Sequence, residues 1–339
     1  MNERLNILKN FLFMGSLYKN KWGGVEKWMF EIGKALRKKG HNVIYCGRPN
    51  SNYIQIANDL LFKSYNVNFR TDFDPLVSYN LWKITKKENI DLIVVGQEKD
   101  LRLLALSFFI GKRPSIVIRK GLSLIKDRWR FKIIYDKMVD RIITPSNALA
   151  DELLDLLPWL DKEKISVIHN GISIPDNVNK GIFRSDINIE NNTFLISIIG
   201  RLSSQKGQKY LIEALNKIKD KLDNTKVVFV GDGEEKSRYI ELVKQYDLIS
   251  IIKFVGHRWD IETILADTDL LIHPSLYEGM PNTILEALSC GTPILATNIP
   301  GVDEIDRGEK VMELVAPKNS DVLADKILTL RSNPDYLLE

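Results

Sequence analysis

The sequence contains few cysteines, few histidines and no long apolar run. Only two cysteines, Cys46 and Cys290, occur in 339 residues, which favours reduced thiols in a cytoplasmic protein over a disulfide framework. No apolar stretch approaches the roughly 20 residues that a membrane-spanning helix needs. Residues 1–15 read as a first buried strand rather than as a secretory signal. These absences predict a soluble protein of the cytoplasm.

Charge is distributed unevenly along the chain. Residues 1–180 contain 30 Lys and Arg against 19 Asp and Glu, a net charge of +11, whereas residues 181–339 contain 18 against 25, a net charge of −7. The difference indicates two domains with different partners. The basic half could attract nucleic acid, an anionic membrane surface or an acidic substrate. Nucleic acid is not expected, because no nucleic-acid-binding module is recognisable.

Short apolar strands alternate with amphipathic helices in both halves of the chain. Strands are expected at 5–15, 41–47, 90–96, 115–121, 140–146, 165–171, 193–202, 225–233, 251–257, 269–275 and 293–299, and helices at 25–40, 100–111, 147–157, 206–222, 234–248 and 282–290. This alternation is typical of parallel sheets covered on both faces, and it predicts doubly wound α/β domains. The polar stretch 176–191 interrupts the pattern and reads as a linker between domains at 1–175 and 192–339.

Two glutamates bracket a turn in the segment "LYEGMPNTILEALSC", which follows an apolar strand. In doubly wound sheets, ligands bind beyond the carboxyl ends of the strands. The first turn of the helix expected from Pro281 or Asn282 would attract an anion there, and Glu286 could accept hydrogen bonds from ribose hydroxyls. Alternatively, Glu286 forms a capping box with Thr283, and Glu278 is a solvated loop carboxylate.

A second polar loop occurs in "IIGRLSSQKGQKYLIEAL". Arg201 stands just past the end of an expected strand, and Lys206 stands just before an expected helix. A guanidinium and an ammonium at this junction could bind a diphosphate, because Arg offers bidentate contacts and Lys a point charge. The alternative is a solvated basic loop.

With these loops in place, the chain resembles the retaining glycosyltransferases of group 1, a family with the GT-B fold. The resemblance covers most of the chain, in the segments "GGVEKWMFEIGKALRKKGHNV", "DRIITPSNAL", "VIHNGI", "GRLSSQKGQKYLIEAL", "VVFVGDGEE", "IKFVGH" and "ADTDLLIHPSLYEGMPNTILEALSCGTPILATNIPGVDEI". Glu278 and Glu286, with seven residues between them, match the family's signature. The resemblance implies two Rossmann-like domains that face each other across a cleft. The first would hold the acceptor and the second the nucleotide-sugar donor.

The resemblance also implies a role for each matching residue. Arg201 and Lys206 would bind the donor's diphosphate and act in catalysis, and Glu278 would contact hydroxyls of the donor sugar. Glu286 would hold the ribose. Further donor contacts are implied for Gly23 and Gly24 in a loop over the reaction centre, for Gly279, Met280, Pro281, Asn282 and Thr283 around the sugar and phosphate, and for Gly256 and His257 near the base.

One position departs from the family pattern. Many relatives have a histidine near the transferred sugar in the first domain, whereas this region reads "SIVIRKGLSL", with Arg119 and Lys120. Arg119 is the expected electrostatic replacement, unless this subgroup uses another group. The other histidines do not fill the gap, because His41 precedes its strand, and His169 and His273 are expected to be packed or hydrogen-bonded.

Two Asp-x-Asp strings resemble the metal-binding motif of some glycosyltransferases. Asp72 and Asp74 lie in an unassigned loop, and Asp267 and Asp269 precede their strand, at the end opposite to the expected ligand edge. Both pairs are expected to be solvated. No metal and no cofactor are predicted, because Arg201 and Lys206 can supply the positive charge that a cation would supply.

A dense basic patch extends from Lys112 to Arg141, with ten Lys and Arg against three Asp and Glu. Its interleaved aromatic residues could enter a membrane interface while the basic groups meet anionic lipid headgroups. Alternatively, the segment is an ordinary surface helix that packs on the sheet through Ile133, Ile134 and Met138.

The combined prediction is a metal-independent retaining glycosyltransferase in the cytoplasm, peripheral on the inner face of the cell membrane. It would transfer a sugar from a nucleotide-diphosphate sugar to a glycan or lipid-linked acceptor, as in surface polysaccharide or glycolipid synthesis. Two alternatives remain. One is an epimerase or phosphorylase with the same fold, and the other is a non-catalytic subunit that binds a partner glycosyltransferase or a membrane.

Overall fold

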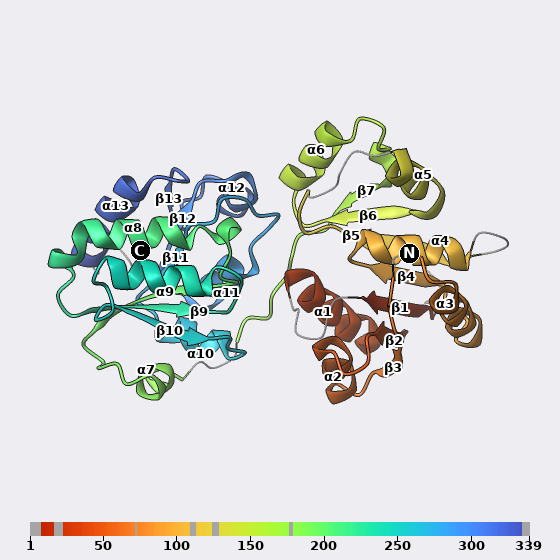
Figure 1. Ribbon diagram of the computed structural model, residues 1–339, viewed down its shortest axis with the longest axis horizontal. Helices are drawn as coiled ribbons and strands as arrows, with labels where there is room; N and C mark the ends of the chain where they lie inside the picture. Colours follow the sequence, from red (N-terminus) through yellow and green to blue (C-terminus); the bar gives the residue numbers. More distant parts are fainter. Residues whose placement is uncertain are drawn as a thin grey trace, which may run out of the picture. The chain divides into compact units, whose positions relative to one another are not determined.

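The computed structural model describes residues 8–16, 23–71, 73–108, 113–123, 129–175 and 179–333, except for the side chain of Arg130. The chain divides into two compact units, Met1–His169 and Asn170–Glu339, here called unit 1 and unit 2 (Figure 1). Each unit contains one parallel sheet with helices packed on both faces. This is the doubly wound α/β architecture that the alternating pattern predicts.

The sheet of unit 1 has seven strands in the order β3-β2-β1-β4-β5-β6-β7. The strands are β1 (Asn10–Gly15), β2 (Asn42–Gly47), β3 (Lys63–Asn66), β4 (Leu92–Val95), β5 (Ser115–Arg119), β6 (Arg141–Thr144) and β7 (Ile165–Val167). The helices are α1 (Gly24–Lys38), α2 (Asn52–Asp59), α3 (Pro75–Lys87), α4 (Glu98–Ser107), α5 (Trp129–Met138) and α6 (Asn147–Leu156). The strand order reverses between β1 and β4, so the carboxyl ends of these strands form the expected ligand position of unit 1.

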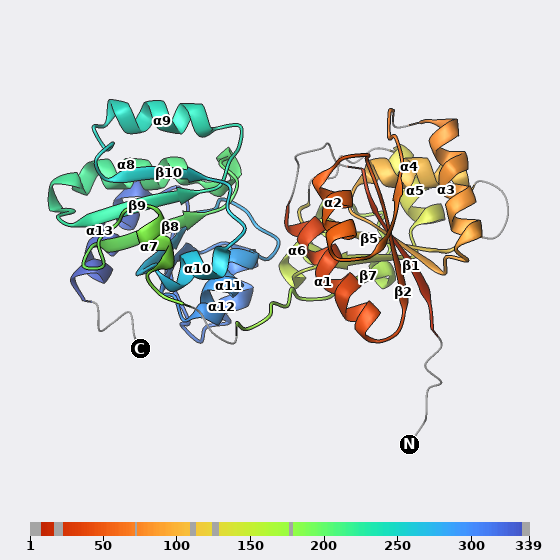
Figure 2. The same cartoon turned by 90° about the horizontal axis from the view of Figure 1, so that it is seen from below.

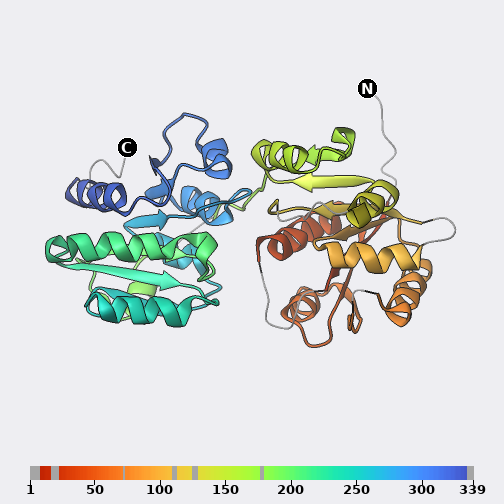
Figure 3. The same ribbon diagram turned by 45° about the horizontal axis from the view of Figure 1, so that its top comes forward.

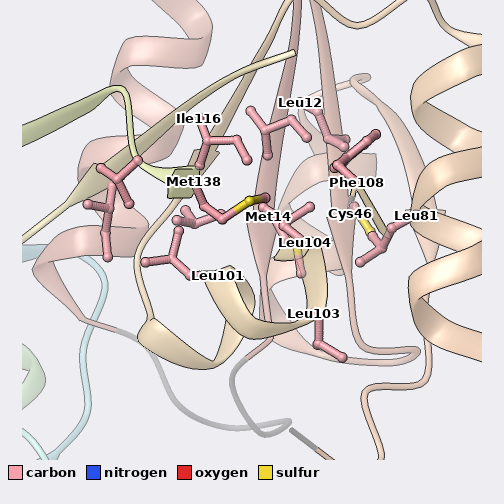
Figure 4. Close-up of a cluster of buried hydrophobic side chains, with 14 of the residues drawn as sticks. Leu12, Met14, Cys46, Leu81, Leu101, Leu103, Leu104, Phe108, Ile116 and Met138 are labelled. Atoms are coloured by element: carbon pink, nitrogen blue, oxygen red, sulfur yellow. The ribbon is translucent and has the colours of Figure 1, made fainter. Parts of the chain in front are cut away.

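Apolar side chains cover both faces of the unit 1 sheet. On one face, Leu12 of β1 and Leu101 of α4 belong to one large buried cluster (Figure 4). On the other face, Tyr45 of β2 stacks on Phe30 of α1, with 4.4 Å between ring centroids. Because neighbouring residues of a strand point to opposite faces, Leu12 and Phe13 enter different clusters. Burial of both faces accounts for the nearly continuous apolar sequence of β1.

The sheet of unit 2 has six strands in the order β10-β9-β8-β11-β12-β13. The strands are β8 (Phe194–Ile199), β9 (Thr225–Val230), β10 (Ile252–Gly256), β11 (Leu270–His273), β12 (Ile294–Thr297) and β13 (Glu313–Val315). The helices are α7 (Ile182–Asp186), α8 (Gln208–Ile218), α9 (Lys236–Gln245), α10 (Ile261–Ala266), α11 (Asn282–Cys290), α12 (Pro300–Asp306) and α13 (Ser320–Ser332). The order reverses between β8 and β11.

Helices also cover both faces of the unit 2 sheet. Helices α8, α9 and α13 pack on one face, and α7, α10, α11 and α12 pack on the other (Figure 2). Helices α8 and α9 lie side by side on their face (Figure 3). In the opposite layer, Ile284 of α11 and Val302 of α12 are fully buried. The sheet beneath the loops at its carboxyl edge is thereby packed on both faces.

The expected linker at 176–191 contains helix α7, whose Phe183 and Arg184 are buried in unit 2. Arg184 Nη2 lies 2.6 Å from Asp269 Oδ2, and the backbone N–H of Arg184 donates to Asp267. The sequence-based expectations are therefore wrong for this part of the linker and for the solvation of Asp267. The two aspartates attach α7 to unit 2. Within the described residues, no helix is both long and apolar enough to cross a bilayer.

Candidate functional site

Two loops of unit 2 meet where the strand order of its sheet reverses. Arg201 and Lys206 lie in the loop after β8, and Glu278 lies in the loop after β11. Both loops leave the carboxyl ends of their strands, which is the edge where doubly wound sheets bind ligands. The structure therefore brings together three of the residues that the sequence assigns to donor binding.

Backbone contacts hold these two loops against each other. The Leu276 N–H donates to the Gln205 carbonyl at 2.8 Å, and the Gln205 side chain donates to the Tyr277 carbonyl at 3.0 Å. Gly207 has a φ of +64°, and a Cβ on it would lie 2.0 Å from the Pro274 carbonyl oxygen. Only glycine fits at this contact, because a side chain would push the loops apart.

Lys206 and Glu278 form an ion pair between the two loops. Nζ of Lys206 lies 2.6 Å from Oε1 of Glu278, and the side chains are only 20% and 9% exposed. The Ser275 hydroxyl donates to the same Oε1 at 2.8 Å, and His273 Nε2 lies 3.4 Å from it. The alternatives of a solvated carboxylate and a solvated lysine are therefore wrong.

The neighbouring groups keep Glu278 ionised and oriented. Burial opposes its ionisation, but the charge of Lys206 and the contact with His273 prevail and lower its pKa to about 2. Burial also lowers the pKa of His273, which is therefore neutral at neutral pH. Because Ser275 gives its single hydroxyl hydrogen to Glu278, its oxygen accepts from the Nε2–H of His273 at 3.0 Å. The expectation that His273 is hydrogen-bonded is confirmed.

Arg201 differs from Lys206 in being available to a ligand. Its side chain is exposed, and its guanidinium forms no ion pair or hydrogen bond with the part of the chain that the structure describes. Its backbone is held in place, because the Gln208 side chain donates to the Arg201 carbonyl at 2.9 Å. The loop after β8 thus presents one unengaged guanidinium and one ammonium that a carboxylate neutralises.

Helix α11 begins at Asn282, as the sequence predicts, with Pro281 as its N-cap residue. Thr283 already lies inside the helix, and the N-cap residue Pro281 makes no side-chain cap. Thr283 is therefore not at the N-cap position that a capping box with Glu286 requires. Glu286 is buried, with 8% of the residue exposed, one turn into a helix whose N-terminal dipole favours an anion.

The turn before α11 is held by a residue that sequence reasoning missed. The Asn170 side chain donates to the Met280 carbonyl at 3.1 Å and to Asn282 Oδ1 at 2.7 Å. Asn170 lies in "VIHNGI", one of the segments in which the chain resembles the group 1 family. That resemblance was the one feature of the sequence that could have pointed to Asn170 as a site residue. More than a hundred positions separate the partners, and no local pattern indicates that they meet.

The residues expected near the base lie at the end of the edge strand β10. Gly256 has a φ of +75°, and the space beside it is open. His257 is exposed and contacts the Trp259 ring edge-on, with 4.6 Å between centroids. Arg258 is bound to Asp186 and Asp260 at 2.5 and 2.7 Å. Within this segment, His257 is therefore accessible to a ligand, whereas Arg258 is ion-paired with Asp186 of α7 and with Asp260.

Unit 1 places the expected glycine loop at the N-terminus of α1. Gly23 is the N-cap residue and Gly24 is the first helical residue. The Glu26 carboxyl lies beside Gly23, where a Cβ would come within 3.2 Å of Glu26 Oε2. Burial raises the pKa of Glu26, and backbone hydrogen bonds from Glu26 and Gly23 partly offset the rise. Glu26 was not singled out in the sequence.

Arg119 lies at the end of β5, but its side chain is buried. Its guanidinium donates to the Lys120 carbonyl at 2.7 Å and lies 5.0 Å above the centroid of the Trp28 ring. Burial lowers the pKa of Arg119 to about 10, so it keeps its charge at neutral pH. Lys120 is paired with Glu98 of α4. Both cations at this edge of unit 1 are thus engaged by unit 1 itself.

Asp100 of α4 is a fully buried carboxyl group close to this edge. Neither of its oxygens has a hydrogen-bond partner of acceptable geometry among the described residues. Burial raises its pKa to about 7, Glu26 and Glu98 add to the rise, and the nearby Ser16 hydroxyl opposes it. Sequence reasoning missed Asp100, because one acid on an amphipathic helix reads as solvated.

The Asp-x-Asp strings do not form a metal site in the described residues. Asp74 caps the N-terminus of α3 by accepting from the Leu76 and Val77 amides, and Asp72 lies outside the described residues. Asp267 and Asp269 hold Arg184, as described above. No group of three or more potential ligands from His, Cys, Asp and Glu is present in the part that the structure describes.

Both halves of the chain match models of glycosyltransferase families. The family model for glycosyl transferases group 1 matches residues 179–338, and that for glycosyltransferase family 4 matches residues 22–174. An α-1,3-galactosyltransferase from Escherichia coli, which acts on α-D-GlcNAc-diphosphoundecaprenol with UDP-Gal, is 30% identical over 79% of this chain and 74% of its own. The chain belongs to the group 1 glycosyltransferases.

Other relatives of this glycosyltransferase extend the comparison. A Campylobacter jejuni α-1,3-N-acetylgalactosaminyltransferase that acts on N,N'-diacetylbacillosaminyl-diphospho-undecaprenol is 26% identical over 88% of this chain and 84% of its own. Among solved structures, Anabaena HepE in complex with UDP and glucose superposes with a TM-score of 0.81 at 22% identity, over 97% of this chain and 92% of that one. The fold is GT-B, as predicted.

Proposed function

We propose that this glycosyltransferase moves a sugar, with retention of anomeric configuration, from a nucleotide-diphosphate sugar to a glycan or lipid-linked acceptor. The observation that carries the proposal is the pairing of Lys206 with Glu278 across two loops, the first of which also carries the exposed guanidinium of Arg201. A site with two cations, a fixed carboxylate and a helix N-terminus has the groups that a diphosphate and a sugar require.

In the proposed reaction, the bond between the anomeric carbon and the diphosphate breaks through an oxocarbenium-like transition state. Negative charge then develops on the leaving diphosphate, where Arg201 and Lys206 stabilise it. Glu278 orients the donor sugar through its hydroxyls, and Glu286 holds the ribose. A donor phosphate oxygen accepts the proton of the attacking acceptor hydroxyl, since no side chain of unit 2 is assigned as a base.

Unit 1 is the proposed acceptor domain, with Arg119 as the electrostatic replacement for the family's histidine. Relatives named for lipid-diphosphate acceptors support a lipid-linked acceptor and a role in surface polysaccharide or glycolipid synthesis. The net charge of +11 on residues 1–180 would favour such an anionic substrate. Because Arg119 is buried, it would act on the acceptor through its field and through Lys120 rather than by direct contact.

We further propose a cytoplasmic location with peripheral contact to an anionic membrane through the Lys112–Arg141 patch. On α5, Trp129 and Ile133 are 71% and 51% exposed, which supports insertion into an interface. Tyr135 and Met138 are buried and attach the helix to unit 1, so packing and membrane contact use different faces. Lys112, Lys126 and Arg128 lie outside the described residues.

The first test is a thermal-shift screen of uridine, adenosine, guanosine and thymidine diphosphates and their sugars. Binding of one nucleotide family is expected, and transfer to a diphosphate-lipid acceptor should follow with that donor. The anomeric configuration of the product, read by NMR, tests retention. An inverted product contradicts retention, nucleotide-sugar isomerisation without transfer indicates an epimerase, and the absence of any nucleotide binding favours a non-catalytic subunit.

The second test concerns metal. Transfer should proceed at an unchanged rate in EDTA, because Arg201 and Lys206 are proposed to supply the charge that a divalent cation supplies elsewhere. The measurement is the initial rate before and after chelation, with added Mg²⁺ or Mn²⁺ as the comparison. A strict requirement for either ion contradicts metal independence.

A further inference from the structure

The Lys206–Glu278 pair puts a fixed negative charge beside the cation that is proposed to bind the diphosphate. Lys206 Nζ and Glu278 Oε1 are only 2.6 Å apart. The loops that carry them are tied by one backbone hydrogen bond, by one hydrogen bond from the Gln205 side chain to a backbone carbonyl, and by the close approach at Gly207. A ligand therefore cannot separate the pair by moving one loop, and a bound diphosphate must share the ammonium with the carboxylate.

The second oxygen of Glu278 is chemically distinct from the first. Oε1 receives hydrogen bonds from Lys206 and Ser275, with His273 close by. No group in the described part of the chain donates to Oε2. Ser275, which His273 orients by donating to its hydroxyl oxygen, continues to donate to Oε1 when phosphate engages the ammonium. A carboxylate has lone pairs for further donors, so Oε2 can accept from a ligand hydroxyl.

A sugar nucleotide and its free nucleoside diphosphate differ at this position in the charge that they bring near the carboxylate and in the hydroxyl donors that they offer to Oε2. The free diphosphate ends in an unesterified terminal phosphate whose last ionisation has a pKa of about 6, as in other terminal phosphates, so at neutral pH it carries roughly one more negative charge. In the sugar nucleotide, the sugar esterifies that phosphate, which removes the charge and brings hydroxyl donors. The free diphosphate repels a nearby carboxylate, whereas the sugar nucleotide can donate a hydrogen bond to it.

We propose that Glu278 makes the donor site discriminate in favour of the sugar nucleotide and against the nucleoside diphosphate that transfer releases. The proposal rests on the proposed function of the same site. A cationic diphosphate site without this carboxylate would bind the more highly charged product more tightly and would release it slowly. With Glu278 in place, the loss of the sugar removes a hydrogen-bond donor and adds a repulsion, so product release is promoted.

The test is calorimetric titration of UDP and UDP-glucose, both of which occur in complexes of the Anabaena relative. Glu278→Gln removes the charge but preserves the shape. The variant should bind UDP more tightly and UDP-glucose no more tightly, so the ratio of the two dissociation constants should shift toward UDP by about tenfold, equivalent to about 1.4 kcal/mol. An unchanged ratio overturns the proposal.

Glu286→Gln is the matched control, because it makes the same chemical change at the proposed ribose contact, which both ligands share. It should weaken both ligands alike and leave their ratio unchanged. The parent protein supplies an independent measurement with the β-phosphate methyl ester of UDP, which lacks the additional charge and the sugar. The ester should bind the parent more tightly than UDP, and UDP should regain the advantage in Glu278→Gln.

The two proposals fail in different ways. If the parent protein binds no nucleoside diphosphate and no sugar nucleotide, the proposed function is wrong. If it binds both but the ester binds more weakly than UDP, and Glu278→Gln leaves the ratio unchanged, the donor site stands and the discrimination by Glu278 is wrong. Thermal unfolding of both glutamine variants confirms that each is folded before titration.

Discussion

The two units place charged residues at equivalent edges of their sheets but engage them differently. In unit 1, Arg119 is only 2% exposed and donates to a neighbouring carbonyl, and Lys120 is paired with Glu98. In unit 2, Lys206 is paired with Glu278, whereas Arg201 is exposed and has no partner in the described residues. The comparison shows that one architecture supports an internally balanced edge in unit 1 and an edge with an available cation in unit 2.

The buried acids of the two units also differ in how they are satisfied. Asp100 of unit 1 has no hydrogen-bond partner of acceptable geometry among the described residues, and burial raises its pKa to about 7. Glu278 of unit 2 has a pKa of about 2, because Lys206 and His273 outweigh the effect of burial. Nearly equal burial thus accompanies opposite shifts of the carboxyl pKa. The difference lies in the hydrogen-bond donors and positive charges that the tertiary fold places beside each carboxyl group.

The largest expected effect is on catalysis in unit 2. Arg201→Ala and Lys206→Ala should each lower kcat by about 10²–10³-fold, because the leaving diphosphate gains charge in the transition state. Donor affinity should fall less than kcat. The measurement is steady-state kinetics beside calorimetric donor binding, with Lys217→Ala on the far part of α8 as a folded control. A loss of donor affinity with kcat unchanged would show that the cations act only in binding.

The next largest effect concerns stability in unit 1. Asp100→Asn should raise the free energy of unfolding at pH 7.5 by on the order of a few kcal/mol, because the ionised carboxylate is destabilised by burial. The folded pKa is raised above the unfolded value of 3.8. The destabilisation therefore grows as pH rises from about 4 to about 7 and should be small near pH 4. Denaturant unfolding of parent and variant at both pH values measures it.

His273 in unit 2 should respond to pH in the opposite sense. Its folded pKa is lowered from 6.5, so the unfolded state binds the proton more readily and stability falls as pH drops below that value. His273→Gln should remove this loss of stability at low pH while keeping a donor near Ser275.

For Asp100, a stabilisation by Asp100→Asn that is equal at pH 4 and pH 7.5 would contradict the proposed ionisation of its carboxyl group.

A smaller effect is expected at the proposed ribose contact. Glu286→Ala should weaken nucleoside diphosphate binding by about 1–3 kcal/mol, since hydrogen-bond partners are left unpaired. Glu286→Gln should be milder, because an amide can still accept from a hydroxyl. Calorimetry measures both. Unchanged affinity together with a small loss of stability would assign Glu286 to holding α11 rather than to the ligand.

The smallest effect per residue is expected at the Lys112–Arg141 patch of unit 1, the proposed membrane contact. The protein should bind vesicles that contain anionic lipid but not neutral ones, with each basic group contributing about 1 kcal/mol and with weakening by salt. Joint charge reversal should release it; the four positions are Lys126, Arg128, Arg130 and Lys132. Nucleotide binding by unit 2 should be unaffected. Retained transfer to a soluble acceptor would assign the patch to membrane contact, and lost transfer without vesicle binding would assign it to the acceptor.

A matched control uses another exposed apolar surface of unit 1. Tyr79 and Trp82 of α3 stack on each other with 5.9 Å between centroids and are 57% and 40% exposed. Substitution of both by Ser should leave vesicle binding unchanged if the α5 surface makes the contact. If the α3 double variant is released and the charge-reversal variant is not, the assignment to the Lys112–Arg141 patch is wrong.

Elements with a strong apolar pattern were predicted well, and those without one were missed. Strands such as β11, with the sequence LLIH, are buried on both faces, so their sequences are mostly apolar. Edge strand β3, with the sequence KSYN, has no fully buried residue and no such signal. Helix α7 was read as part of a linker, because its five residues are held by Arg184 contacts to distant aspartates rather than by an amphipathic pattern.

For the site, residue types and loop positions were predictable, but partners were not. Lys206 and Glu278 were singled out separately, because each follows a strand at the ligand edge. Their pairing joins loops 72 positions apart, and no local pattern encodes such a contact. The same reason explains why Ser275 and Asn170 were missed, since their importance lies in what they touch.

The sequence by itself determined the alternation of strands and helices, the edge of each sheet where ligand binding is expected, and the cations and carboxylates present there. These follow from local periodicity and from the direction of parallel strands. The tertiary structure decided which charged side chains form ion pairs with each other and which remain available to a ligand. Burial and long-range packing set that division. They leave Asp100 without a hydrogen-bond partner of acceptable geometry among the described residues. They also place three polar groups near Glu278 and leave Arg201 exposed.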